Sequence, residues 1–63
     1  MKKYTLRYWQ KTAHNSITSI TERFSDEKEM TVSVYEIFND PSVVCIETEA
    51  DGVITVHKVW TEN

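Results

Sequence analysis

The side chains with the most evident chemistry in this 63-residue sequence are its one cysteine, Cys45, and its two histidines, His14 and His57. A cysteine nucleophile needs a base within hydrogen-bond reach and donors for the oxyanion that forms. Cys45 and His57 lie in two segments that we expect to pair as strands, with Cys45 facing His57. A flat sheet face offers neither a cleft nor oxyanion donors, and no helix N-terminus lies beside the thiol to activate it. We therefore predict a protein that is not an enzyme.

Metal binding is the other chemistry that these residue types suggest. A structural zinc site takes four Cys or His ligands at short paired spacing. The chain has three such residues and no CxxC or HxxxH pair, although Glu47 would share a face with Cys45 and His57. Acidic pairs such as Glu27 with Glu29 need a substrate groove for catalysis, which a domain of this size lacks. We predict no metal and no cofactor.

Basic and aromatic side chains alternate along the first predicted strand. Those that share one face with Thr5 are Lys3, Arg7, Trp9 and Lys11. Single-stranded nucleic acid binds to such faces, with phosphates on Lys or Arg and bases stacked on aromatic rings. The whole chain has seven basic and ten acidic residues and a net charge of −3, which disfavours a polyanionic partner. A small single-stranded nucleic-acid-binding module is therefore our alternative hypothesis.

Hydrophobic periodicity defines the elements that must position these residues. Residues 3–10 alternate with period two, which is typical of a half-buried strand. The side opposite the basic face is formed by Tyr4, Leu6 and Tyr8. Residues 11–16 are polar and predict a loop, and residues 16–24 are rich in Thr and Ile, which favours a second strand.

The segment 26–39 fits two patterns. Asp26 is a suitable N-cap, and Pro41 ends the element because the residue before a proline is disfavoured in a helix. The apolar residues at helical spacing are Met30, Val34, Ile37 and Phe38. Residues 30–35 also alternate in the manner of a strand. We predict a helix over 26–39, because the cap and the apolar spacing agree, and keep a strand as the alternative.

The last two predicted strands, around 43–46 and 53–56, flank a turn that contains Gly52. A glycine suits the left-handed position of a three-residue loop, which would set Glu49 opposite Val53. The face expected to pack on the helix would then carry Val44, Ile46, Ile54, Val56 and Trp60. The other face would carry Val43, Cys45, Glu47, Val53, Thr55, His57 and Val59.

Together these elements predict one α+β domain over residues 1–63, in the order ββαββ, with an antiparallel sheet and one helix packed on one face. If 26–39 is a strand, the alternative is an all-β five-stranded small barrel. No apolar run is long enough to span a membrane. A lone cysteine, and the lack of an apolar run after Lys2 and Lys3, predict a cytoplasmic protein.

The outer face of the predicted sheet is the feature most suggestive of function. Apolar residues gather there, and the anchors that we predict are Trp9, Val43, Cys45 and Val59. A contiguous exposed apolar patch marks an interaction site, and a partner would supply core that so small a domain lacks. We predict a small non-enzymatic protein-interaction domain, homodimeric or bound to a partner protein. Its size also suits an accessory protein of a phage or mobile element, although no residue carries that interpretation.

Overall fold

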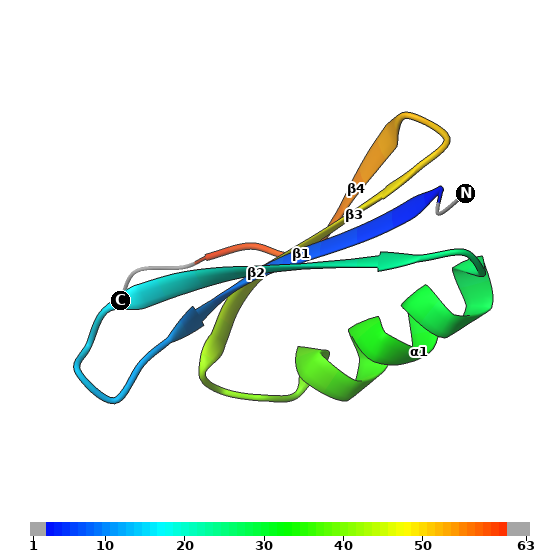
Figure 1. The fold of residues 1–63 in the computed structure, drawn as a ribbon. Coiled ribbons are helices and arrows are strands. Elements are labelled where there is room, and N and C mark those ends of the chain that lie inside the picture. Colours follow the sequence, from blue (N-terminus) through cyan, green and yellow to red (C-terminus); the bar gives the residue numbers. More distant parts are fainter. Residues whose placement is uncertain (1–2, 61–63) are drawn as a thin grey trace.

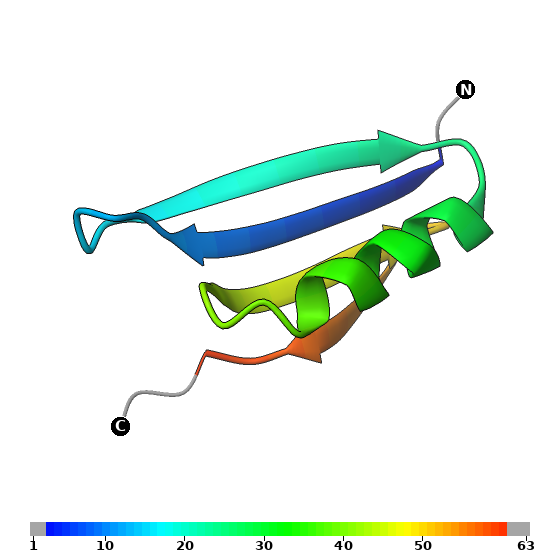
Figure 2. The same cartoon turned by 90° about the horizontal axis from the view of Figure 1, so that it is seen from below.

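Four antiparallel strands and one helix make up the structure, a computed structural model that describes residues 3–60 (Figure 1). The elements in chain order are β1 (Tyr4–Lys11), β2 (Ile17–Phe24), α1 (Glu27–Phe38), β3 (Val43–Ala50) and β4 (Val53–Lys58). The sheet is open, with the strand order β2-β1-β3-β4, and α1 lies across one of its faces (Figure 2). The predicted ββαββ fold is confirmed. The barrel alternative is wrong, because residues 27–38 form a helix rather than a fifth strand.

β1 is a central strand that pairs with both β2 and β3. Its alternation turns Leu6 toward α1, where that side chain is fully buried, and leaves Arg7 exposed on the opposite face. The loop to β2 is closed by the Thr12 N–H, which donates to the Ser16 carbonyl at 2.8 Å. Asn15 takes a positive φ of 65° in this loop, a conformation that asparagine tolerates better than most residues.

Both ends of α1 are stabilised by charge and hydrogen bonding. Asp26 caps the N-terminus, since its carboxylate accepts a hydrogen bond from the Lys28 N–H at 3.0 Å. The last turn of α1 has no basic residue of its own. Instead Lys58 of β4 donates from Nζ to the carbonyl oxygens of Phe38 at 3.2 Å and Asp40 at 3.4 Å. A cation is favourable at a helix C-terminus. The contacts of Lys58 therefore stabilise the packing of the end of β4 against the end of α1.

The core lies between α1 and the two central strands. Its buried apolar members are Leu6, Met30, Val34, Val43 and Ile46, and the half-buried side chains packed on them are Tyr4, Tyr8, Phe24 and Ile37. Met30 and Val34 belong to the apolar helix face expected from the sequence. Burial also raises the pKa of the Tyr8 phenol, and the nearby Glu22 and Asp40 carboxylates raise it further. Helix and sheet are therefore joined by a small core of five buried apolar side chains.

The turn between β3 and β4 is one residue shorter than the three-residue loop predicted from the sequence. Asp51 and Gly52 have φ values of 52° and 81°, and they form a two-residue turn in which Ala50 pairs with Val53. Positive φ at both central positions is typical of the tight hairpin turn whose twist matches that of the strands. The predicted pairing of Glu49 with Val53 is therefore wrong by one residue.

This shift exchanges the two faces of β4, because adjacent residues of a strand point to opposite sides of the sheet. Ile54 pairs with Glu49 and Val56 pairs with Glu47, so both apolar side chains lie on the face opposite α1. Thr55 pairs with Thr48 on the helix side. The prediction that Ile54 and Val56 pack against the helix is wrong.

A β-bulge in β3 accounts for a second difference. Trp9 pairs with Cys45, but Gln10 pairs with Val43, so Val44 is an extra residue on β3. The bulge returns Val43 to the helix side, where it is 1% exposed and belongs to the core. Val43 was predicted as an anchor of the outer face, and that placement is wrong.

Candidate functional site

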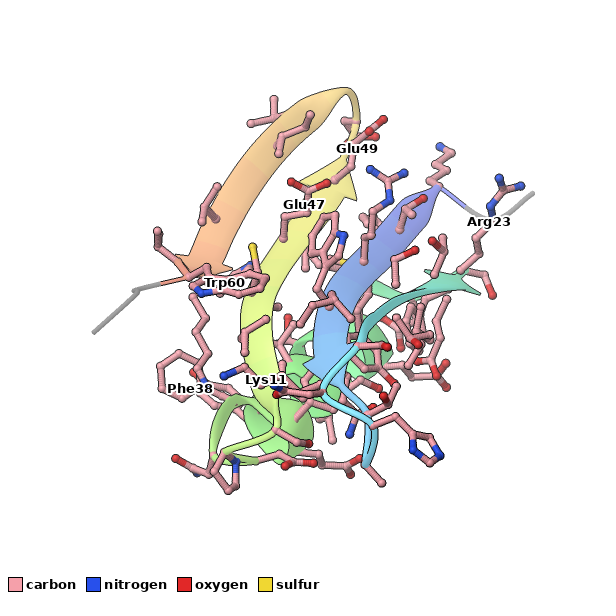
Figure 3. The ribbon with its side chains drawn as sticks, turned by 90° about the vertical axis from the view of Figure 1, so that its left-hand side faces the viewer. Lys11, Arg23, Phe38, Glu47, Glu49 and Trp60 are labelled. Carbon is pink, nitrogen blue, oxygen red and sulfur yellow. The ribbon has the colours of Figure 1, made fainter. Side chains whose placement is uncertain are left out.

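The outer face of the sheet, defined as the face opposite α1, is the candidate functional site. Cross-strand partners share a face, so the pairings of Arg7 with Glu47 and of Trp9 with Cys45 place these four residues on it together. Figure 3 views this face with α1 behind the sheet. It shows Glu47 and Glu49 along β3, and Arg23 on β2 at the sheet edge opposite β4. Trp60 lies over β3, beyond the end of β4.

Five apolar or aromatic residues form a band on this face, which we call the apolar strip. The apolar strip consists of Trp9, Cys45, Ile54, Val56 and Trp60. Ile54 is 58% exposed, Val56 55% and Trp60 41%, whereas Trp9 and Cys45 are half-buried. Single exposed apolar side chains are ordinary on protein surfaces, but contiguous exposed apolar patches are typical of interaction sites, which makes the apolar strip a candidate.

Charged side chains flank the apolar strip and are unevenly distributed. The Arg7 guanidinium donates to Glu47 Oε1 at 2.8 Å, an ion pair that is open to solvent and contributes little to stability. The outer face carries the cations Lys3, Arg7, Lys11 and Arg23 and the acids Glu47 and Glu49. The acids around α1 are Asp26, Glu27, Glu29, Glu36 and Asp40. The outer face is thus locally more basic than the chain as a whole.

The predicted interface anchors are only partly brought together. Trp9 and Cys45 lie side by side on the outer face, and Val59, which follows β4, is 68% exposed. Val43 is in the core. The exposed members Ile54 and Val56 were missed, and the Asp-Gly pair at 51–52 is the sequence signal that could have found them, because Asp-Gly favours a two-residue hairpin turn.

The residues of the alternative hypothesis lie along β1. Arg7, Trp9 and Lys11 alternate with the core-facing residues of that strand, and Lys3 immediately precedes it. Arg23 on β2 pairs with Thr5 and adds a cation to the same face. Glu47 neutralises part of this charge through its ion pair with Arg7.

The residues considered for catalysis and metal binding are separated by the sheet. Cys45 and Glu47 lie on the outer face, whereas His57 turns to the helix side and its Nε2 lies 2.7 Å from Thr48 Oγ1 in a hydrogen bond. The suggested dyad and the three-residue metal set are therefore not assembled. Within residues 3–60, no three His, Cys, Asp or Glu side chains gather closely enough to hold a metal ion.

A groove of about 340 Å³ on the opposite side of the sheet is the second surface feature. It runs between α1 and β4, with Met30 and Val34 among its lining residues from the helix and Thr55 and His57 from the strand. Tyr35 on its rim is 72% exposed. The groove exists because α1 packs over the central strands and leaves the helix side of β4 uncovered.

The fold and this surface define a small α+β domain with an open, one-sided sheet. No family model, curated protein or solved structure matches the chain significantly. Across the part of the chain that the structure describes, no helix has the length and apolar character needed to cross a membrane.

Proposed function

We propose that this chain is a non-enzymatic protein-interaction domain that binds a partner protein through the outer face of its sheet. The observation that carries the proposal is the joint exposure of Ile54, Val56 and Trp60 on the face opposite α1. The centres of protein–protein interfaces are enriched in Trp and Arg. The apolar strip contains two tryptophans and lies beside Arg7. The composition of the outer face therefore suits a binding surface.

The chemistry of the partner follows from the arrangement of charge. Apolar side chains of the partner would cover the apolar strip. Carboxylates of the partner would face the β1–β2 side, where Lys3, Arg7 and Arg23 lie. Such rim charges act mainly on association rate and specificity rather than on affinity. We also propose a cytoplasmic location, because Cys45 is a free thiol and a reducing compartment keeps such a thiol from oxidation.

Selection of a displayed random peptide library against the purified chain tests this proposal. We expect ligands that combine apolar and acidic residues and bind with Kd below roughly 100 µM. Ile54→Asp and Trp60→Ala should each weaken those ligands at least tenfold. The matched control is Val32→Asp, since Val32 is an exposed apolar residue on α1 at 50% exposure. Equal affinity for the wild type and both outer-face variants, or no ligand of that strength, would contradict the proposal.

Single-stranded nucleic acid is the second candidate, favoured by the cations and Trp9 on one face of β1. A fluorescent mixed oligonucleotide titrated at low and moderate salt separates it from the first. Nucleic-acid binding predicts an affinity that falls steeply with salt and is lost in Arg7→Glu but kept in Lys28→Glu, a matched change on α1. Peptide binding that persists at moderate salt while the oligonucleotide does not bind would favour the first candidate.

A further inference from the structure

The two edge strands of the sheet, β2 and β4, differ in how well their side chains protect them from pairing with another chain. The proposed function does not depend on this difference. β2, one edge, carries Glu22 and Arg23, and charged residues protect an edge strand from pairing with another chain. The rest of β2 is uncharged but mainly polar, with Thr18, Ser19 and Thr21. β4, the other edge, ends in Lys58 but begins with an uncharged run of four β-branched residues, Val53–Val56. Val53 is 65% exposed, and Ile54 and Val56 are exposed to a similar degree. This run contains no proline, no charge and no bulge.

The backbone of β4 presents donors and acceptors at defined positions of this edge. In an antiparallel pair, residues alternate between those that bond to the partner strand and those whose N–H and C=O point away. The two-residue turn makes Ala50–Val53 the closing bonded pair, and Thr55 is the next residue that bonds to β3. Ile54 and Val56 therefore direct their N–H and C=O groups toward the free edge.

We infer that β4 pairs with β4 of a second copy of this chain, antiparallel about a two-fold axis at Thr55. In this register Ile54 of each copy meets Val56 of the other, and each such pair exchanges both of its N–H···O=C bonds. The Thr55 residues face one another at the axis. The β-bulge between Ile46–Lys58 and Glu47–Val56 begins directly after this run and ends the pairing. The inference goes beyond the proposed function because it concerns the edge of the sheet rather than its face.

The side chains fit the same arrangement. On the outer face, Ile54 and Val56 of both copies form one cluster, and no like charges meet because residues 53–56 carry none. The apolar strip, which lies toward one edge of the single sheet, comes to lie in the middle of an eight-stranded one. On the other side, the grooves beside Tyr35 and Phe38 of the two copies meet. A symmetric interface of this kind is self-complementary, as a closed dimer requires.

The length of the edge sets the strength of the dimer. Three paired residues, 54–56 of each copy, span about 10 Å, so the interface belongs to the small class whose complexes are weak and reversible. We expect a dimer with a Kd in the micromolar range, in exchange with the monomer.

Sedimentation analysis of the purified chain over a concentration series tests the inference. The wild type should show the reversible dimer. Thr55→Lys places like charges together at the axis and should leave a monomer, and Thr55→Glu should do the same. An equimolar mixture of the two variants should restore a heterodimer, which also shows that both fold. Thr18→Lys, a matched change on the exposed strand at the other edge, should leave the wild-type dimer intact.

Three results would overturn the inference. One is a wild type that stays monomeric up to roughly 1 mM, because a dimer with a micromolar Kd would be almost fully formed at that concentration. Another is a dimer that Thr55→Lys does not change. The third is a dimer lost in Trp60→Ala but kept in Thr55→Lys, which would assign dimerisation to the outer face. Because Thr55 lies on the helix side, loss of the dimer in Thr55→Lys with unchanged peptide binding separates the edge from the proposed function.

Discussion

Ala50 pairs with Val53 across a turn in which Asp51 and Gly52 both have positive φ. This pairing decides which side of the sheet each residue of β4 occupies, because side chains alternate along a strand. It turns Ile54 outward and Thr55 toward the helix side. The outward position of Ile54 and Val56 in the apolar strip and the direction of their N–H and C=O groups toward the free edge both follow from that register.

Gly52→Ala should destabilise the domain by about 1 kcal/mol, since a left-handed conformation is costly for any residue with a Cβ. Gly52 has φ 81°, and an added Cβ would meet no atom within 4 Å, so the cost is conformational and not steric. Urea denaturation measures the change. Asp51→Asn is the control and should be neutral, because asparagine tolerates positive φ; a Gly52→Ala variant as stable as the wild type would contradict the turn.

Lys58→Met should lower the free energy of unfolding by about 0.3–1 kcal/mol at low ionic strength and by less at high salt. The change removes the ammonium that donates to the carbonyl oxygens of Phe38 and Asp40 and lies 5.8 Å from the centre of the Phe38 ring. Lys28→Met removes a cation near the N-terminus of α1, where a positive charge is unfavourable, and should not destabilise. Equal losses in the two variants would show that the position of Lys58 is unimportant.

Asp40 should make the free energy of unfolding decrease at acid pH. Hydrogen bonds from the Ser42 Oγ–H at 2.7 Å and the Ser42 N–H at 2.9 Å hold the pKa of the Asp40 carboxyl below its ordinary value of 3.8, and Lys58 lowers it further. A folded-state pKa below the unfolded one gives stability that is present above about pH 4 and lost as the pH falls through the folded value. Asp40→Asn should show a smaller loss of stability in that range. Parallel pH curves for the two proteins would exclude this contribution.

Leu6→Ala should cost about 2–5 kcal/mol, because Leu6 is completely buried among the few apolar side chains of the core. In so small a domain this is comparable with the whole free energy of folding, so we expect an unfolded or barely folded chain by circular dichroism. Val32→Ala removes an exposed side chain of α1 and should leave the fold intact. A cooperative thermal transition for Leu6→Ala near the wild-type temperature would contradict the assigned core.

The fold could be predicted from the sequence because its signals are local and agree with one another. Period-two alternation around Leu6 defines β1, and the Asp26 cap together with Met30 and Val34 defines α1. Trp9 and Cys45 were also placed on the correct face. What failed was the register of the last hairpin, where one residue of loop length exchanges the two faces of β4.

The bulge at Val44 could not be predicted from local pattern. It depends on how β3 pairs with β1 around Gln10, whose side-chain amide donates to Ser42 Oγ at 2.8 Å. That contact joins residues far apart in the chain. Val43 was consequently predicted on the outer face although it lies in the core.

Binding of a partner protein by the outer face can be mapped residue by residue in an amide-resolved NMR titration of the chain with a library-selected peptide. We expect the largest chemical-shift changes at Trp9, Cys45, Ile54 and Val56, and none at the exposed helix residues Val32 and Glu36. Shifts confined to α1 and the groove beside Tyr35 would contradict it and move the binding site to the helix side.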